Sequence, residues 1–301
     1  MRAPRGLGLR LTRRGRAVAA ALAALGAAGV FHVWSGGRAE TATSLGPDGR
    51  YAAGACTSYP PATDRFDDPP VVFLDPGHGA LDYGTSGVTA DGDPVAEKDA
   101  ALTVAMRARS LLLRKGFEVV MSRTKDTPVA RLSASEIDGT VYTSEGARHN
   151  MKARLQCANS ARADVLVSIH FNAFTDPSVG GAATYYDPAR RFSARSRRLA
   201  GLLQSHIDSA FEEAGWTIPD RGVQQDTDAG SAISEEASAY GHLYLLGPRK
   251  KGFNEHPSKM PGALTEPLFL SNPEEASIIA TEKGQGTLAA GIAEGIAAFL
   301  R

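Results

Sequence analysis

The stretch Val71-Val-Phe-Leu-Asp-Pro-Gly-His-Gly79 carries the clearest structural signal in the sequence. A short apolar run ends at Asp75-Pro76, and two glycines then bracket a single imidazole, His78. The run predicts a buried strand, because Pro76 cannot continue the hydrogen-bond ladder and glycine allows backbone angles that other residues avoid. His78 is therefore expected on a tight, exposed turn at the carboxyl end of a strand, where α/β proteins bind ligands.

A second apolar run, Asp164-Val-Leu-Val-Ser-Ile-His-Phe-Asn-Ala173, carries His170 and Asn172 at its end. Between the two histidines lies Glu97, where a helix is expected to begin. Two histidines and one carboxylate form a ligand set of catalytic zinc sites, which keep a fourth position for water. Since a parallel sheet brings strand ends together, the sequence predicts a metal site at this edge. The alternative is a group of polar side chains with structural roles only.

Residues 71–301 alternate between strand and helix patterns. This alternation predicts one α/β domain with a mixed, mostly parallel sheet and helices on both faces. About 230 residues are enough for one hydrophobic core, and no internal repeat divides them. Besides the two histidine strands, the expected strands are 117–121, 182–186, 242–246 and 263–270, and the expected helices are 97–115, 150–163, 192–214 and 287–300.

The N-terminal residues 1–34 have the pattern of an export segment. Six arginines and no acidic residue occur there, and residues 17–34 are almost wholly small and apolar. A basic region before an apolar stretch predicts export from the cytoplasm. No clean cleavage site follows, so the two alternatives are a cleaved signal and a retained N-terminal membrane anchor formed by residues 17–34. Residues 35–70 are rich in Gly, Pro, Thr, Ser and Asp and predict a flexible linker.

The charge balance argues against a polyanionic partner. The complete chain carries 33 basic and 33 acidic residues. Without the six arginines of the export segment, the remainder has a net charge of about −6. Nucleic-acid binding calls for a basic face, so no nucleic-acid partner is expected. The same balance argues against tight electrostatic binding to anionic polymers.

Two cysteines, Cys56 and Cys157, are present in the sequence. An even number of cysteines in an exported chain predicts a disulfide, with two free thiols as the alternative. Cys56 lies shortly before the first expected strand, and Cys157 lies in the helix that leads into the His170 strand. A bridge between them would close a loop of about 100 residues and stabilise the fold by about 4–5 kcal/mol in the chain-entropy model.

Four sequence blocks together resemble one enzyme family. They are Phe73-Leu-Asp-Pro-Gly-His-Gly-Ala-Leu-Asp-Tyr-Gly84, the helix start at Glu97, Ser168-Ile-His-Phe-Asn172, and Leu264-Thr-Glu-Pro-Leu-Phe-Leu-Ser-Asn-Pro273. These blocks are similar to those of the zinc-dependent N-acetylmuramoyl-L-alanine amidases of the AmiC-like, peptidoglycan-cleaving type, and they occur in the same order. The resemblance covers residues from about 70 to 300, nearly the whole chain beyond its N-terminus.

The resemblance implies specific roles and a specific reaction. His78, Glu97 and His170 match the ligands of one zinc ion per chain, and Glu266 matches the catalytic glutamate. The implied reaction is hydrolysis of the amide between the lactyl group of N-acetylmuramic acid and L-alanine, in peptidoglycan or muropeptide fragments outside the cytoplasm. One alternative is another zinc hydrolase of wall peptides, such as a carboxypeptidase. The other is a non-catalytic wall-binding or regulatory protein, which would be free to lose these four residues.

The fourth block departs from the family pattern near its catalytic residue. Pro267 directly follows Glu266, and Leu268 stands where the family usually has glycine. Pro267 removes a backbone donor and is expected to shift the strand edge slightly while Glu266 stays in place. A carboxylate that is not a metal ligand takes the proton of the attacking water and returns it to the leaving amine, which is the role expected of Glu266.

Two polar residues near the expected ligands have further expected roles. Asn172 lies two residues past His170 and therefore on the same face of an extended segment. It is expected to bind substrate, with a turn-forming asparagine as the alternative. Asp75 is expected to anchor the His78 turn and not to bind metal.

Relative to the family, residues 224–241 are an insertion of polar character. They are expected to form a surface loop near the cleft, and a solvated loop without function is the alternative. His149 and His242 flank polar loops of this kind. No spacing links either histidine to the expected ligands, so both are left out of the site.

Overall fold

The computed structural model describes residues 42–46, 49–229 and 239–301, all of which belong to one compact unit. The predicted export segment, residues 1–34, lies outside the described residues. None of the helices in the described part of the chain combines the length and the hydropathy that crossing a bilayer requires.

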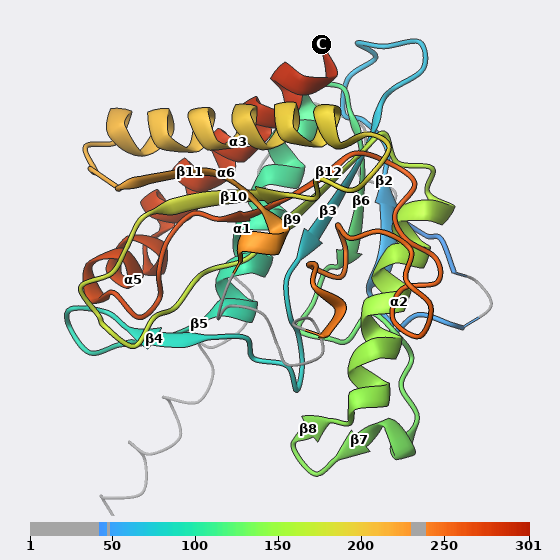
Figure 1. Cartoon of the computed structure of the whole chain (residues 1–301). Helices are drawn as coiled ribbons and strands as arrows, with labels where there is room; N and C mark the ends of the chain where they lie inside the picture. Colours follow the sequence, from blue (N-terminus) through green and yellow to red (C-terminus); the bar gives the residue numbers. More distant parts are fainter. Residues whose placement is uncertain (1–41, 47–48, 230–238) are drawn as a thin grey trace, which may run out of the picture. The chain divides into compact units, whose positions relative to one another are not determined.

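An eight-stranded mixed sheet forms the centre of the unit, with the strand order β1-β2-β6-β3-β9-β12-β10-β11 (Figure 1). Strand β3 runs parallel to both of its neighbours, β6 and β9, and β9 runs parallel to β12. The carboxyl ends of β3, β9 and β12 therefore meet at one edge of the sheet, as predicted for a mixed α/β sheet. The strands are β1 (Thr43–Ser44), β2 (Ala55–Tyr59), β3 (Val71–Pro76), β6 (Glu118–Arg123), β9 (Val165–Ile169), β10 (Ala182–Tyr186), β11 (Asp220–Gln225) and β12 (Gly262–Glu266).

Helices cover both faces of this sheet, which confirms the predicted layers (Figure 1). Val72 and Leu74 pack with helices α1 (Glu97–Arg114), α3 (Ser193–Glu213) and α6 (Glu282–Leu300). Phe73 points the other way and packs with α2 (Ser144–Ser160), because successive side chains of a strand alternate between faces. The smaller elements are α5 (Pro273–Ala280), the hairpins β4 (Ser86–Val88) with β5 (Pro94–Ala96) and β7 (Ile137–Asp138) with β8 (Val141–Tyr142), and the short helices η1 (Ala134–Glu136) and η2 (Asp226–Asp228).

Two helices begin earlier than the apolar pattern predicted. Helix α2 starts six residues before residue 150, because Thr143 caps it by accepting a hydrogen bond from the Gly146 backbone at 3.1 Å. Helix α6 starts five residues before residue 287, where Thr281 caps the Gly284 backbone in the same way. A cap satisfies backbone donors that the hydrophobic periodicity of a helix does not report, so the pattern alone places the start too late.

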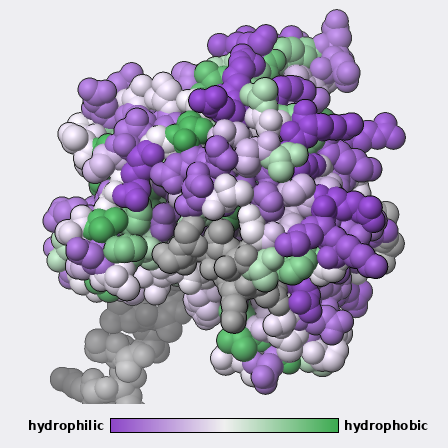
Figure 2. Space-filling model, viewed as in Figure 1, coloured by the Kyte–Doolittle hydropathy of each residue, from purple (hydrophilic) through white to green (hydrophobic). Residues whose placement is uncertain are grey.

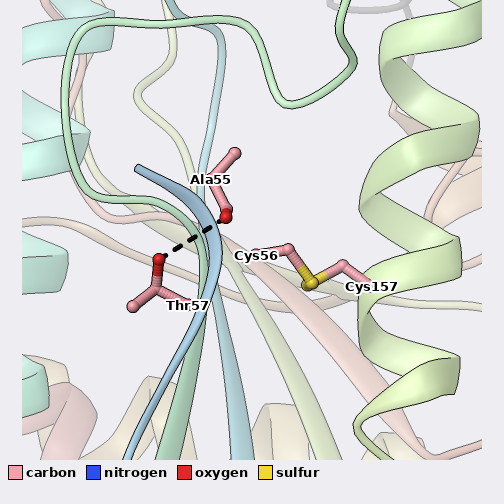
Figure 3. Close-up of a disulfide and its surroundings, with 4 residues drawn as sticks. All are labelled: Ala55, Cys56, Thr57 and Cys157. Carbon is pink, nitrogen blue, oxygen red and sulfur yellow. Dashed lines mark hydrogen bonds between the residues drawn. A yellow bond between two sulfur atoms is a disulfide. The ribbon is translucent and has the colours of Figure 1, made fainter. Parts of the chain in front are cut away.

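The predicted linker, residues 35–70, is wrong for strands β1 and β2. All five residues of β2 are buried, and the strand pairs with β6 in an antiparallel ladder. Cys56 lies in β2 and is joined by a disulfide to Cys157 in α2, with the two Cα atoms 5.6 Å apart (Figure 3). A short strand among turn-forming residues gives a weak composition signal, and here neighbouring β6 supplies its hydrogen bonds.

The predicted strand over residues 242–246 is also wrong. The segment forms turns, in which the backbone N–H groups of Leu246 and Gly247 donate to the Leu243 carbonyl at 3.0 and 2.8 Å. The sheet instead contains β11, which pairs in parallel with β10 and was not predicted. Strand β11 reads Asp-Arg-Gly-Val-Gln-Gln, and this polar edge strand lacks the apolar run on which the prediction relied.

The face shown in Figure 2 is mostly hydrophilic, with scattered hydrophobic residues. Such scattering is ordinary for a water-exposed surface, so it marks no docking patch by itself.

Candidate metal centre

His78, Glu97 and His170 converge at the edge where the parallel strands end. His78 follows β3, His170 follows β9, and Glu97 is the first residue of α1. Glu97 Oε1 lies 3.1 Å from His78 Nε2 and 2.9 Å from His170 Nδ1, and the two nitrogens are 3.1 Å apart. Ligand atoms 2.0–2.1 Å from a tetrahedral zinc ion lie about 3.3 Å from one another. The triangle formed by these three atoms is therefore close to the spacing that zinc requires.

Two glycines make room for this close approach. A Cβ atom on Gly77 would overlap the His170 ring, and one on Gly84 would overlap both the Glu97 carboxylate and the His78 ring. Gly84 also has a positive φ of 64°, whereas in the His78 turn the positive φ angles include 59° at His78 and 133° at Gly79 but not Gly77. Gly77 is thus needed for space and not for its backbone angle. A donor triangle enclosed this tightly fits a small cation.

The His78 turn is anchored by Asp75, as the sequence predicted, but the anchor works through Arg154. The fully buried Asp75 carboxylate accepts a hydrogen bond from Arg154 Nη1 at 2.6 Å and one from Ser168 Oγ at 2.8 Å. Arg154 also donates to the carbonyls of Pro76 and His78. Burial alone would raise the pKa of Asp75, but the charge of Arg154 and the hydrogen bonds from Ser122 and Ser168 together lower it. One buried ion pair therefore holds the backbone on both sides of the turn.

A second buried guanidinium, Arg123, joins the segments that carry two of the ligands. Its Nη2 donates to the carbonyls of Gly77 and Lys98, each at 2.7 Å. Gly77 precedes His78 and Lys98 follows Glu97, so one side chain fixes their spacing. Burial and the nearby Arg154 charge lower the pKa of Arg123 to about 10. The guanidinium stays charged at neutral pH in spite of its burial.

His78 and Glu97 are oriented by groups outside the ligand set. His78 Nδ1 contacts Asp82 Oδ1 at 2.7 Å, which turns Nε2 toward the centre. The Glu97 carboxylate accepts backbone N–H bonds from Thr85 at 2.7 Å and Phe171 at 3.0 Å. Burial lowers the pKa of His78, but hydrogen bonds to Asp82 and Glu97 outweigh burial and raise it to about 10. Surroundings that favour a cation on the ring also favour a metal ion in its place.

Glu266 is the last residue of β12, and the strand ends where Pro267 interrupts it. Burial and the negative charge of Glu97 raise the pKa of Glu266 to about 8. The Asn172 side-chain amide, expected to bind substrate, donates a hydrogen bond to Glu266 Oε2. A carboxyl with this pKa is suited to exchange protons near neutral pH.

The histidines left out of the site have other partners. His149 Nδ1 contacts Glu136 Oε1 at 2.6 Å, and His242 Nδ1 contacts Asp187 Oδ2 at 2.8 Å. The predicted insertion contains η2 and residues 230–238, and the latter lie outside the described residues. Sequence reasoning missed Asp82, Arg123 and Arg154, because their roles depend on contacts between distant segments.

Comparisons with known proteins identify relatives over most of the chain. A family profile described as N-acetylmuramoyl-L-alanine amidase matches residues 72–298. The germination-specific N-acetylmuramoyl-L-alanine amidase of Bacillus subtilis is 29% identical over 226 residues, which cover 75% of this chain and 78% of that relative. AmiA of Escherichia coli is 28% identical over 246 residues, which cover 76% of this chain and 75% of that one.

Solved structures give the same picture. The N-acetylmuramoyl-L-alanine amidase of Clostridium difficile 630 is 30% identical with a TM-score of 0.56, and the match covers 78% of this chain and 98% of that one. The CwlD amidase of Clostridioides difficile, solved in complex with the GerS lipoprotein, is 25% identical with a TM-score of 0.59 and coverages of 77% and 98%.

Proposed function

The chain belongs to the N-acetylmuramoyl-L-alanine amidase family, and from this membership we propose that it is a zinc hydrolase acting on peptidoglycan outside the cytoplasm. The family reaction is hydrolysis of the amide bond between N-acetylmuramic acid and the L-alanine of the stem peptide, and this chain is an amidase of that kind. The observation that carries the zinc assignment is the convergence of His78 Nε2, Glu97 Oε1 and His170 Nδ1 within 3.1 Å of one another.

These three atoms would hold one zinc ion, and neighbouring groups orient them toward a common point. When bound, zinc lowers the pKa of a coordinated water toward about 7 and polarises a carbonyl oxygen. Asp82 keeps the His78 ring in the orientation that offers Nε2. Two neutral imidazoles and one carboxylate leave the centre with a net positive charge, which preserves its strength as a Lewis acid.

Glu266 would act as the general base and then as the general acid of the hydrolysis. Asn172 donates to Glu266 Oε2, so we assign proton uptake from the attacking water to Oε1. The pKa of about 8 lets the same carboxyl accept that proton and then deliver it to the leaving amine. Because burial and the charge of Glu97 oppose ionisation, both the protonated and the ionised carboxyl are populated between about pH 7 and 9.

The substrate and the N-terminal sequence both support a location outside the cytoplasm. Peptidoglycan lies outside the cytoplasmic membrane, and the basic and apolar pattern of residues 1–34 supports export. The assignment of residues 17–34 as cleaved signal or retained anchor stays a prediction. A non-catalytic role is disfavoured, because three converging ligands and a glutamate of raised pKa would serve no purpose in it.

Product analysis tests the amidase assignment. Purified protein loaded with zinc would be incubated with peptidoglycan and with soluble muropeptides, and the products identified by mass spectrometry. Intact stem peptides with a free L-alanine amine are expected, together with peptide-free glycan. Free amino acids released from the carboxyl end of the stems would instead identify a carboxypeptidase. The Glu266→Gln variant is the matched control, because it preserves the shape of the side chain.

A further inference from the structure

A second group of ligand-type side chains lies outside the zinc centre. Asp187 follows β10, Asp226 is the first residue of η2, and His242 directly follows the inserted segment. The relative exposure of Asp187 is 2% and that of Asp226 is 0%, whereas the His242 ring is partly exposed. His242 Nδ1 lies 2.8 Å from Asp187 Oδ2 and 3.4 Å from Asp226 Oδ1. Three potential metal-binding atoms therefore meet at one point.

The two carboxylates are already oriented by the backbone. Asp187 Oδ1 accepts the Ala189 N–H at 2.7 Å, and Asp226 Oδ2 accepts the Leu243 N–H at 3.1 Å. Each carboxylate thus has one oxygen fixed by the main chain and turns the other toward His242.

One of the inward oxygens lacks a hydrogen bond. Asp187 Oδ2 is buried and makes no hydrogen bond of good geometry among the described residues, and its close polar neighbour is His242 Nδ1 at 2.8 Å. A buried carboxylate oxygen without a donor is costly unless a proton or a cation meets it. Arg190, the nearby guanidinium, directs its hydrogen bonds to the Leu246 and Gly247 carbonyls and to Ser258.

We propose that Asp187, Asp226 and His242 form a second divalent-cation site, separate from the zinc centre. One imidazole nitrogen and two carboxylate oxygens are a donor set that suits Zn²⁺ or Mn²⁺. A cation there would join the end of β10 to Asp226 near the start of the inserted segment and to His242, which directly follows it. Burial and the Asp187 charge also raise the pKa of Asp226, so a cation would displace a proton that otherwise relieves the repulsion. This site does not depend on the amidase assignment.

Metal counting tests the proposal without reference to activity. Chelator-treated protein is reloaded with Zn²⁺ or with Mn²⁺, dialysed and assayed for metal per chain. With zinc the unaltered protein should hold about two equivalents, and the His170→Ala and Asp226→Asn variants about one each. The double variant should hold essentially none. Asp228→Asn is the matched control, because Asp228 is an exposed acid two residues away, and it should keep both.

Two outcomes would overturn the second site. One is unaltered protein that binds a single equivalent which His170→Ala removes, because the three residues would then share a proton and hold no cation. The other is Asp226→Asn protein that keeps both equivalents. If Asp226→Asn does not fold, the His170→Ala count decides, since the second site requires about one residual equivalent and a rise in melting temperature on reloading. The test of the second site uses metal content and melting temperature and does not depend on amidase activity.

Discussion

Asn172 donates its side-chain amide to Glu266 Oε2 and so joins the end of the His170 strand to the end of β12. The pairing couples a metal-binding strand to the proposed general base. It also stabilises the ionised carboxylate, because the Asn172 hydrogen bond lowers the pKa that burial and Glu97 raise. Asn172 is therefore a positioning residue in this structure, and its expected contact with substrate stays a prediction.

Replacing Asn172 should shift the pH dependence of the reaction. In Asn172→Ala the lost donor no longer stabilises the charged carboxylate, so the pKa of Glu266 rises further. The acid limb of kcat/KM, which reports the ionised base, should move to higher pH by about one unit. Zinc content should be unchanged. A pH–rate profile identical to that of the unaltered enzyme would show that the hydrogen bond does not tune Glu266.

Much of the fold follows from local pattern. Strong signals come from the apolar runs at residues 71–76 and 165–169 and from the periodic helix after Glu97. A strand that is buried on both faces has few polar residues, so its apolar run is easily recognised. Strands β2 and β11 do not carry such an apolar signal and could not be predicted from it. Their sequences are short or polar, and they become strands only because an adjacent strand supplies hydrogen bonds.

In the candidate site, too, residues marked by a local pattern could be predicted and residues that depend on distant contacts could not. His78 and His170 are recognisable because each ends an apolar run, a feature of a single segment. Arg154 contacts Asp75 across 79 residues of sequence, and Arg123 reaches Lys98 across 25. No spacing rule connects such pairs, since their contact exists only after the sheet and α2 have packed. The sequence therefore predicted the histidine ligands but not the roles of Arg123 and Arg154.

Removal of a ligand should empty the zinc centre. His78→Ala and His170→Ala should each lose about one equivalent of zinc and essentially all amidase activity, because two ligands hold zinc far more weakly than three. Metal content measured by mass spectrometry on dialysed protein checks this. His206→Ala, a histidine of α3 away from both ligand groups, is the control and should keep its zinc and activity. Zinc retained at this centre by either ligand variant would contradict the assignment.

The buried Arg154–Asp75 pair should dominate the stability of the His78 turn. Arg154→Met leaves a fully buried carboxylate without its partner, which should lower the free energy of unfolding by about 3–5 kcal/mol. Lys152→Met, on the exposed side of the same helix, should change it little. Urea denaturation gives both values. The double variant Asp75→Asn/Arg154→Met should lose less than the sum of its single changes, and strict additivity would show that the pair is not coupled.

The Cys56–Cys157 bridge should stabilise the domain through its long loop. The bridged residues are 101 apart in sequence, and the chain-entropy model gives about 4–5 kcal/mol for such a loop. Protein made in an oxidising compartment should show no free thiol when denatured, and reduction should lower its melting temperature. A Cys56→Ser/Cys157→Ser variant should not respond to reductant. Two readily alkylated thiols in the oxidised protein would refute the bridge.

The last prediction separates proton transfer from metal binding. Glu266→Gln keeps the size of the side chain. Its carbonyl oxygen can still accept a hydrogen bond from the Asn172 amide, but it cannot take a proton from water. General acid–base catalysis contributes about 10²–10⁴ in rate. The variant should therefore turn over muropeptides at least about a hundredfold more slowly, while its zinc content and its affinity for peptidoglycan fragments stay the same.

Three measurements on this variant locate the cause of any defect. Loss of zinc would make Glu266 a ligand, and the triangle of His78, Glu97 and His170 would then be incomplete as described. Full activity would place the general base elsewhere, in spite of the burial and raised pKa of Glu266. If the slow variant instead keeps its zinc and loses the acid limb of its pH–rate profile, the titrating group is Glu266 itself, because glutamine at that position has no proton to exchange.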